Sequence, residues 1–364
     1  MPYKRRGNQT RRRKKSQDDA PGTLRQFAAY DRMKKIRERR APFFSGAAAE
    51  TMNVFLCESI HPEALALLRS RAEIISSWDR LNEADAIVNR NLKLPSEVLC
   101  RAERLKTIAV HGTGSDGIDL DWCRNHDVCV TYVPYENADS VAELIVAFAL
   151  CLLRKIPRAD RLVLSGAPIQ NAPPELFGNE LRGKTLGLVG TGDIARRAAR
   201  IMKDGFGVNV IGYSPSLNDE TAQKLGIRRC ASVTDVMRDA DIISVGVHLT
   251  PQTEHMISAA EFTAAKPTAV LINTSRGGVV DEAALYEALT TGKIAAAACD
   301  VWESEPPTRR NPLVGLDSVL ATPHIGANTD EALRRVGLAM VRQIFDVLDG
   351  KQPRWTYSAD RPKG

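Results

Sequence analysis

The sequence has no closely spaced pair of cysteines. Its seven cysteines are odd in number, scattered along the chain and mostly set in apolar surroundings. Disulfide frameworks and zinc sites both depend on paired or clustered cysteines at characteristic spacings. Neither is therefore predicted, and we expect reduced thiols in a cytoplasmic protein.

Long apolar runs are also lacking. The most apolar run, residues 144–153, falls far short of the roughly 20 residues that a membrane-spanning helix needs, and Glu143 and Arg154 close it off. The basic N-terminal residues are not followed by the apolar stretch of a secretory signal. No contact with a membrane is expected.

An excess of positive charge is confined to one end of the chain. Residues 1–50 hold 15 Lys and Arg against 5 Asp and Glu, whereas the other 314 residues hold 35 against 39. The mildly acidic body gives no reason to expect nucleic-acid binding. Like-charge runs are usually solvated, so residues 1–50 are predicted to form a disordered basic tail. Contact of this tail with nucleic acid is the less favoured alternative.

What the sequence does contain is a repeated pattern of short apolar runs followed by polar or glycine residues. Its 364 residues, 43% hydrophobic and 26% charged, suit a soluble protein of two or three domains. Runs such as 185–189 and 269–273 have the length of strands. Their alternation with helical segments predicts an α/β fold of doubly wound parallel sheets, in which ligands bind at the carboxyl ends of the strands.

Two long helices are expected. Residues 137–154 are apolar nearly all round and predict a buried helix, which Asp139 or Ser140 can cap. The segment that follows, as far as Arg182, is rich in proline and glycine and is interpreted as a loop at a domain boundary. The second long helix is predicted to begin at Ala327.

A glycine-rich turn follows the predicted strand 185–189. Gly190, Gly192 and Ala195 form the pattern G-x-G-x-x-A, which combines a tight turn, close approach of the backbone to a pyrophosphate and a helix N-terminus. Because the pattern lies between a strand and a helix, it predicts dinucleotide binding. The next strand should end in the acidic residue that binds the ribose of NAD, but Ser214 stands there and no Arg or Lys follows immediately. NAD is the expected cofactor, and NADP stays open.

Three successive strand ends near the C-terminus carry a cation, a carboxylate and an imidazole. These residues are Arg276, Glu305 and His324. Reduction of a 2-keto acid needs a group that holds the substrate carboxylate, a group that moves a proton, and a group that tunes the proton carrier. The three residue types therefore predict that chemistry.

The motifs around these residues resemble the D-isomer-specific 2-hydroxyacid dehydrogenase family. They are N-T-S-R-G-G-V-V-D-E-A-A-L from Asn273, D-V-W-E-S-E-P from Asp300 and T-P-H-I-G from Thr322, and the likeness extends from about Val54 to Trp355. The resemblance implies an NAD(P)-dependent dehydrogenase that interconverts a small 2-keto acid and a D-2-hydroxy acid. It also implies a homodimer and no metal.

The resemblance further implies how the chain is divided. A Rossmann cofactor domain, residues 146–325, would be inserted into a flavodoxin-like substrate domain made of residues 51–145 and 326–355.

The family's site residues can be carried over to matching positions. Arg276 would hold the substrate carboxylate, His324 would act as the acid and base, and Glu305 would favour the protonated, oriented imidazole; Glu303 is the competing candidate for that pairing. The cofactor-binding positions are Gly190, Thr191, Gly192, Asp193, Ile194, Ser214, Thr250, Thr274 and Asp300, the last for the nicotinamide carboxamide. The substrate-binding positions are Arg90, Asn91, Gly114, Ser115 and Asn137.

Two other functions share parts of this pattern. A dinucleotide-sensing scaffold similar to the C-terminal-binding protein co-repressors would have the same fold and a similar E-S-E-P segment, and a basic tail would suit it. Formate dehydrogenases need no proton relay, so the pairing of Glu305 with His324 argues against that activity. One departure from the family pattern is Gly246, which stands where a histidine is common.

Overall fold

The structure is a computed structural model of the chain and describes residues 51–56, 58–166, 171 and 173–357. The predicted basic tail, residues 1–50, lies outside these ranges. Within the described residues, the strands form two sheets in which every strand pair is parallel.

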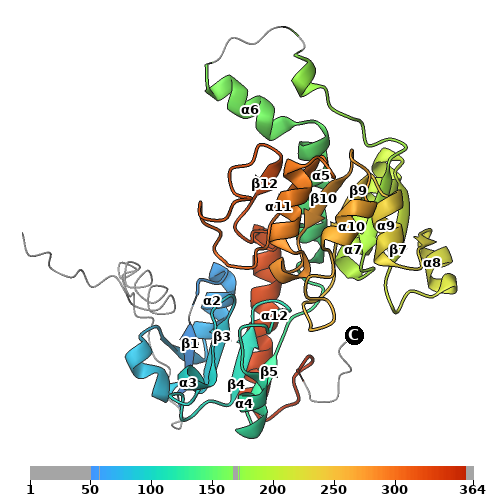
Figure 1. The fold of residues 1–364 in the computed structure, drawn as a ribbon. Helices are drawn as coiled ribbons and strands as arrows, with labels where there is room; N and C mark the ends of the chain where they lie inside the picture. The colour runs from blue at the N-terminus through green and yellow to red at the C-terminus, as the bar shows by residue number, and fades with distance from the viewer. Residues whose placement is uncertain (1–50, 57, 167–170, 172, 358–364) are drawn as a thin grey trace, which may run out of the picture. The chain divides into compact units, whose positions relative to one another are not determined.

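The first sheet has five strands in the order β2-β1-β3-β4-β5 (Figure 1). This is the flavodoxin-like order, in which the order of the strands changes direction between the neighbours β1 and β3. The bounds are β1 Met52–Leu56, β2 Ala72–Ile75, β3 Ala86–Asn89, β4 Thr107–Val110 and β5 Cys129–Thr131. The accompanying helices are α2 Pro62–Arg69, η2 Trp78–Glu83, α3 Ser96–Leu99 and α4 Leu120–Asn125.

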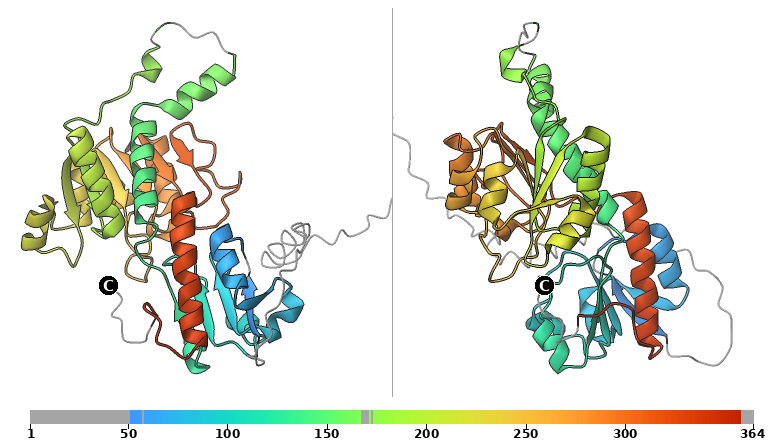
Figure 2. Two further views of the ribbon diagram at one scale, coloured as in Figure 1. Left: turned by 180° about the vertical axis from the view of Figure 1, so that it is seen from behind. Right: turned by 90° about the vertical axis from the view of Figure 1, so that its right-hand side faces the viewer.

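Both faces of this sheet are covered, which explains why its strands are continuously apolar. Alternate side chains belong to two cores, with Phe55 and Ile87 in one and Val54 and Val88 in the other. Helix α12, Asp330–Leu348, supplies the second core with Val336, Met340, Val341 and Ile344. It contacts α2 and β4, and Figure 2 shows α12 (red) beside α2 (blue).

The second sheet has seven strands in the order β12-β11-β10-β9-β6-β7-β8. Counted from β6, the order contains the 3-2-1-4-5-6 arrangement of a Rossmann fold. The bounds are β6 Thr185–Val189, β7 Asn209–Tyr213, β8 Arg228–Arg229, β9 Ile242–Val245, β10 Val270–Asn273, β11 Ala296–Cys299 and β12 Val319–Ala321.

Helices cover both faces of the second sheet as well. Helices α5 and α7 share one core with Leu186 and Ile272, and α9, α10 and α11 share the other with Ile243 and Leu271. Their bounds are α5 Ala138–Leu153, α7 Asp193–Phe206, α8 Asp219–Leu225, α9 Val233–Asp239, α10 Ala259–Ala264 and α11 Glu282–Thr290. Short 3-10 turns lie at η3 Pro174–Leu176 and η4 Gly277–Val279. The predicted α/β fold of two doubly wound parallel sheets is thus confirmed.

Local details differ from the sequence-based expectations at three places. Helix α5 begins after Asn137 without a side-chain cap, because the Ser140 hydroxyl donates to the carbonyl of Gly326 instead and Asp139 pairs with Arg197. The predicted loop after α5 contains helix α6, Ile156–Leu164, whose proline lies in the first turn. Helix α12 begins three residues later than expected, since Thr329 caps it by accepting from the amide of Ala332.

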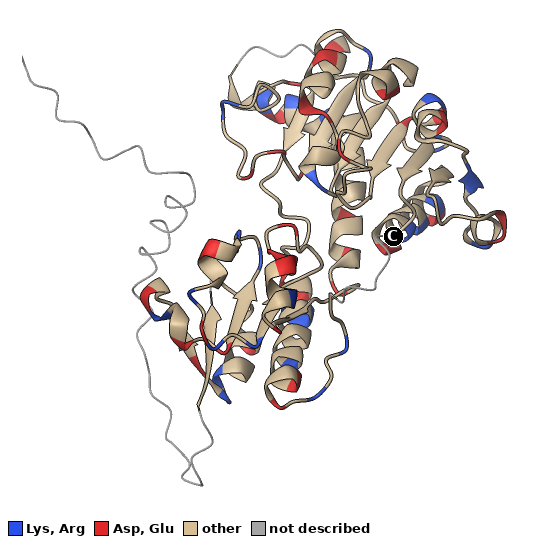
Figure 3. Ribbon diagram, turned by 60° about the horizontal axis from the view of Figure 1, so that its bottom comes forward, with Lys and Arg blue, Asp and Glu red and all other residues tan. Residues whose placement is uncertain are grey.

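Charged side chains lie mainly on the helices and loops, whereas the strands are largely free of them apart from β8 (Figure 3). No helix within the described residues combines the length and the apolar character needed to cross a membrane.

Candidate active site

His324 and Glu305 form a direct pair beside the carboxyl ends of β12 and β11. Nδ1 of His324 lies 2.9 Å from Oε2 of Glu305, while the other carboxylate oxygen of Glu305 accepts from the amide of Trp302 at 3.1 Å. Burial acts to raise the pKa of Glu305, but the hydrogen bond and charge of His324 outweigh it and hold that pKa below its ordinary value. The competing carboxylate, Glu303, contacts His255 instead, at 3.1 Å.

Asp300 shapes the loop that carries His324. Its carboxylate is 1% exposed and accepts from the Thr322 hydroxyl at 2.6 Å and from the amides of Ile325 and Gly326, each at 2.8 Å. Its carbonyl accepts from the amide of His324, which has the left-handed φ of 56° that a non-glycine residue rarely adopts. These bonds hold the imidazole loop in a conformation that the chain would not adopt alone.

A hydrogen-bonded turn at the end of β10 presents Arg276. The buried side chain of Asn273 accepts from the amide of Ser275 at 3.1 Å and from its hydroxyl at 2.9 Å, and it donates to the carbonyl of Arg276 at 3.0 Å. Nη1 of Arg276 in turn donates to the carbonyl of Ser275 at 2.7 Å. The backbone of this turn therefore fixes the position of the guanidinium, although the side chain that carries it is flexible.

The guanidinium of Arg276 lies against the loop that follows β4. Its Nε donates to Oδ2 of Asp116 at 2.6 Å, and a Cβ atom at Gly114 would clash with its Nη2. Predicted residues from both sheets, Arg276 and Gly114, are thus brought together. Asp116, which the sequence-based analysis did not single out, is the acidic partner of Arg276.

Close approach of two loops sets the distance between Arg276 and Glu305. Gly277 lies so near the peptide between Trp302 and Glu303 that a Cβ atom at Gly277 would overlap its backbone atoms. Any side chain at this position would push the Arg276 turn away from the segment that carries Glu305.

Gly277→Ala is therefore expected to reduce the free energy of unfolding by about 1–3 kcal/mol and to lower kcat/KM at least tenfold. Differential scanning calorimetry and steady-state kinetics would measure both effects. The matched control is Gly278→Ala, whose added Cβ would meet only the flexible side chain of Leu249, at 3.3 Å. Equal effects of the two substitutions would contradict the proposed role of the close approach.

The C-terminal segment braces the loop around Gly114 and Ser115. The hydroxyl of Tyr357 donates to the carbonyl of Thr113, and its ring packs on Tyr132 with centroids 4.6 Å apart. Burial raises the pKa of Tyr357, although a hydrogen bond with Ser115 opposes the shift. Tyr357 was missed from the sequence, because a lone tyrosine far along the chain gives no signal of this contact.

Arg90 and Asn91 lie at the switch point of the first sheet. Both of their amides donate to one carboxylate oxygen of Glu58, each at 2.8 Å, which joins the end of β3 to the residues after β1. The guanidinium of Arg90 donates to the side chain of Asn328, in the loop that follows His324. Asn137 forms the N-cap of α5 without a side-chain capping bond, and no contact that we describe joins it to these residues.

The glycine-rich turn lies at the switch point of the second sheet. The amide of Gly190, which has a φ of 93°, donates to the carbonyl of Tyr213 at 2.8 Å, and a Cβ atom at Gly190 would clash with the carbonyl of Gly246. Gly192 is the N-cap of α7, and a Cβ atom there would meet open space. This free volume at a helix N-terminus fits a dinucleotide pyrophosphate.

The other predicted cofactor positions are distributed around this turn. Asp193 and Ile194 form the first turn of α7, and Ser214 follows β7. The amide of Thr250 donates to the hydroxyl of Thr253, in the same loop, at 2.7 Å. Thr274 is partly exposed in the turn that presents Arg276.

The sheet orders and the glycine-rich turn define a doubly wound α/β protein with a Rossmann-type half. The family described as D-isomer specific 2-hydroxyacid dehydrogenase, NAD binding domain, matches residues 146–326. Hydroxypyruvate reductase of Thermotoga maritima is 36% identical over 307 residues, which cover 81% of this chain and 98% of the reductase. The chain therefore belongs to the D-isomer specific 2-hydroxyacid dehydrogenase family, as its motifs predicted, and it contains that family's NAD-binding domain.

Two further comparisons agree. D-3-phosphoglycerate dehydrogenase of Methanocaldococcus jannaschii is 36% identical over 309 residues, which cover 82% of this chain but 58% of the relative, so the chain spans less than two thirds of that protein's length. The crystal structure of D-lactate dehydrogenase from Aquifex aeolicus, complexed with NAD and lactic acid, has a TM-score of 0.72 at 29% identity and covers 82% of this chain and 96% of that one.

Proposed function

We propose that this protein is an NAD(P)-dependent D-2-hydroxyacid dehydrogenase that reduces a small 2-keto acid. The observation that carries the proposal is the meeting of three groups: Arg276 beside the loop at Gly114, and His324 paired with Glu305 at 2.9 Å. These groups follow β10, β11 and β12, which are neighbours in one parallel sheet. The membership of the family supports the same activity.

In this proposal each residue has one task. Arg276 binds the substrate carboxylate with charge-assisted hydrogen bonds, together with the amides of the loop at Gly114 and Ser115. A nicotinamide coenzyme, when bound, would supply the hydride. His324 gives its proton to the carbonyl oxygen during reduction and takes a proton from the hydroxyl during oxidation. Glu305 orients the imidazole through Nδ1 and stabilises its charged form.

The ionised carboxylate of Glu305 gives a dependence on pH. Its pKa lies below its ordinary value because burial, which raises it, is outweighed by the hydrogen bond and charge of His324, so the carboxylate stays ionised at mildly acidic pH. When the pH falls through that lowered pKa, Glu305 gains a proton and no longer offers a charged acceptor to Nδ1 of His324, so kcat/KM for reduction is expected to fall there. Glu305→Gln lacks this charge at every pH and should therefore lower kcat/KM about tenfold at neutral pH, the loss of one charge-assisted hydrogen bond, and remove the acid limb. The pH profile of Glu303→Gln, which alters the pairing with His255, serves as the control and should match wild type. An acid limb that persists unchanged in Glu305→Gln would contradict the role of Glu305.

The domain assignment also enters as part of the proposal. We take residues 51–145 and 326–355 as the substrate domain and residues 146–325 as the cofactor domain. The packing of α12 on the first sheet supports the discontinuous substrate domain. The first of these boundaries falls inside α5, whose residues from Val141 onward share a core with the second sheet.

A homodimer is the proposed assembly. Helix α6, which follows α5 in the chain (Figure 1), has no buried residue. Ile156, Val163 and Leu164 are 49%, 66% and 77% exposed, and their spacing places them on one helical face. An apolar face left open in this way is a suitable surface for a second copy. Sedimentation equilibrium of wild type beside a Val163→Glu, Leu164→Glu variant would test this assembly.

Initial rates of NADH and NADPH oxidation would test the proposed activity directly. The substrates to compare are glyoxylate, hydroxypyruvate, pyruvate and a branched keto acid. Turnover with one of them at ordinary enzyme rates would support the dehydrogenase. Dinucleotide binding without turnover of any of these acids would contradict the activity as stated and would favour a dinucleotide-sensing scaffold.

A further inference from the structure

The loop after β7 carries two hydroxyl groups where many NAD-binding proteins carry a carboxylate. The amide of Leu217 donates to the carbonyl of Ser214 at 3.0 Å, which closes a tight turn around Pro215. The hydroxyl oxygens of Ser214 and Ser216 lie 3.0 Å apart on this turn. Nε of Arg229 donates to the carbonyl of Leu217 at 2.8 Å and so holds the end of this turn. The paired hydroxyls are thus part of a preorganised loop.

A guanidinium reaches the same end of the sheet from α7. Nε of Arg196 donates to the carbonyl of Thr191, the middle residue of the glycine-rich turn, at 2.7 Å. Thr191 adjoins the end of β7, because a Cβ atom at Gly212 would meet its Cγ2 at 3.1 Å and the amide of Gly190 donates to the carbonyl of Tyr213. Arg196 is therefore anchored between the glycine-rich turn and the strand that leads to Ser214.

Arg196 differs from its neighbour in having no acidic partner among the described residues. Arg197, the next residue, pairs with Asp139 at 2.5 Å and with Asp193 at 3.0 Å. The side chain of Arg196 is exposed, and its single hydrogen bond that we describe uses Nε. Its two terminal nitrogens are thus left to bind an anion.

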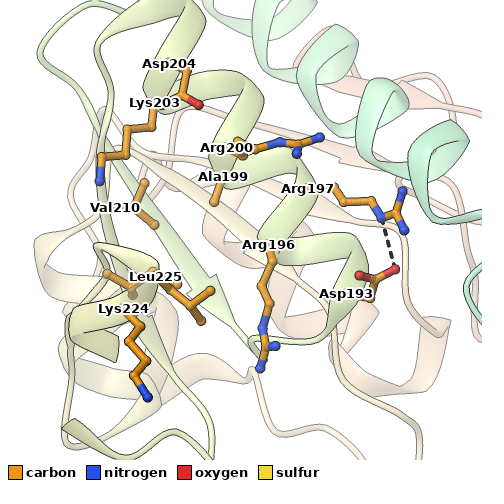
Figure 4. A pocket seen from close by; sticks show the side chains of 11 residues that line it. Asp193, Arg196, Arg197, Ala199, Arg200, Lys203, Asp204, Val210, Lys224 and Leu225 are labelled. Atoms are coloured by element: carbon orange, nitrogen blue, oxygen red, sulfur yellow. Dashed lines mark hydrogen bonds and ion pairs between the residues drawn. The ribbon is translucent and has the colours of Figure 1, made fainter. Parts of the chain in front are cut away.

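The cavity beside Arg196 has more basic than acidic side chains. Arg196 lines a cavity of about 520 Å³, whose other charged residues are the basic Arg197, Arg200, Lys203 and Lys224 and the acidic Asp193 and Asp204. Figure 4 shows the side chain of Arg196 directed toward the start of α7, whereas Lys203 lies at the far end of the helix. The positive field of this cavity favours a ligand that carries additional phosphate charge at the nearby end.

We propose that the coenzyme of this protein is NADP(H), and that Arg196 together with the hydroxyls of Ser214 and Ser216 binds the 2′-phosphate of its adenosine ribose. The inference rests on the dinucleotide binding proposed above and specifies the ligand of that same site. Ser214 removes the carboxylate that would repel a 2′-phosphate, and Arg196 supplies the cation that the residues directly after β7 lack. A planar guanidinium anchored through Nε presents its remaining nitrogens to two phosphate oxygens at once.

Isothermal titration with adenosine 2′,5′-bisphosphate and adenosine 5′-monophosphate tests the proposal without turnover, because the two probes differ only in the 2′-phosphate. Wild type should bind the bisphosphate at least about tenfold more tightly, as one charge-assisted bidentate contact provides. Arg196→Gln should abolish this difference and leave the affinity for the monophosphate unchanged. Ser214→Asp should reverse the preference.

Arg200→Gln is the matched control, since Arg200 lines the same cavity one turn further along α7. It should keep the wild-type preference. A wild type that binds the monophosphate as tightly as the bisphosphate, or an Arg196→Gln variant that retains the preference, would overturn the assignment. Titrations with NADH and NADPH distinguish failure of the coenzyme assignment from failure of the proposed function. If the protein binds NADH and shows no preference for NADPH, only the coenzyme assignment is contradicted. If it binds neither dinucleotide, the dehydrogenase proposal is contradicted as well.

Discussion

Replacement of His324 by alanine is expected to lower kcat for keto-acid reduction by about 10²–10⁴-fold, the usual contribution of a positioned general acid. The imidazole is held by Glu305 at 2.9 Å and by a backbone conformation that Asp300 imposes. No other histidine contacts Glu305 in the part of the chain that the structure describes. Loss of the imidazole would therefore remove the proposed proton donor while leaving the residues of the proposed coenzyme and carboxylate sites in place.

Steady-state kinetics and dinucleotide titration would be measured together for this variant. Coenzyme affinity should stay within about twofold of wild type, because His324 is far from the glycine-rich turn in sequence and forms no described contact with it. His126→Ala is a suitable control, because His126 is the exposed C-cap residue of α4 and stacks on Trp122. A His324→Ala variant that retains more than a tenth of the wild-type kcat would remove His324 from the proposed chemistry.

Replacement of Arg276 by alanine is expected to reduce kcat/KM by about 10²–10⁴-fold, because two hydrogen bonds to charged groups, worth roughly 1.5–3 kcal/mol each, would be lost. Arg276→Lys should recover little of this loss, since an ammonium keeps the charge but not the paired donor geometry. The effect should fall on the keto acid, with the KM for coenzyme nearly unchanged.

Arg71→Ala provides the comparison for Arg276. Arg71 also forms an ion pair with an aspartate, Asp349, at 2.5 Å, but this pair lies at the C-terminal end of α12, whereas the loop that carries His324 precedes the helix. Its removal should alter thermal stability slightly and leave kcat/KM intact. A kcat/KM for Arg276→Ala close to that of Arg71→Ala would show that Arg276 does not bind substrate.

The sequence allowed the central strands to be predicted because they are buried on both faces. Residues 186–189 and 269–272 are all apolar or glycine, and the structure places their alternate side chains in two separate cores. The ends of such strands meet at one edge of a sheet, which is why Arg276, Glu305 and His324 could be grouped before any coordinates were known. Helix α6 could not be foreseen, because its proline suggests a loop but is tolerated in the first turn of a helix.

The partners of these residues could not be predicted in the same way. Asp116 is 160 residues from Arg276, Tyr357 is 244 residues from Thr113, and Asn328 is 238 residues from Arg90. Contacts of this kind depend on how loops from different strands turn, and a single sequence carries no periodic signal for them. Arg196 was overlooked for a related reason: a basic residue was sought directly after β7, whereas the residue that we propose for this role lies on the preceding helix, α7.

The ion pair between Arg276 and Asp116 has a consequence for the proposed binding of substrate. The guanidinium already has a carboxylate at 2.6 Å, so its charge is partly neutralised before any substrate arrives. If Arg276 binds the keto acid as proposed, binding is an exchange of anions at one cation, and the free energy gained is the difference between the incoming carboxylate and that of Asp116. Substitution of Asp116 would then alter the affinity for keto acids without any contact between Asp116 and the substrate.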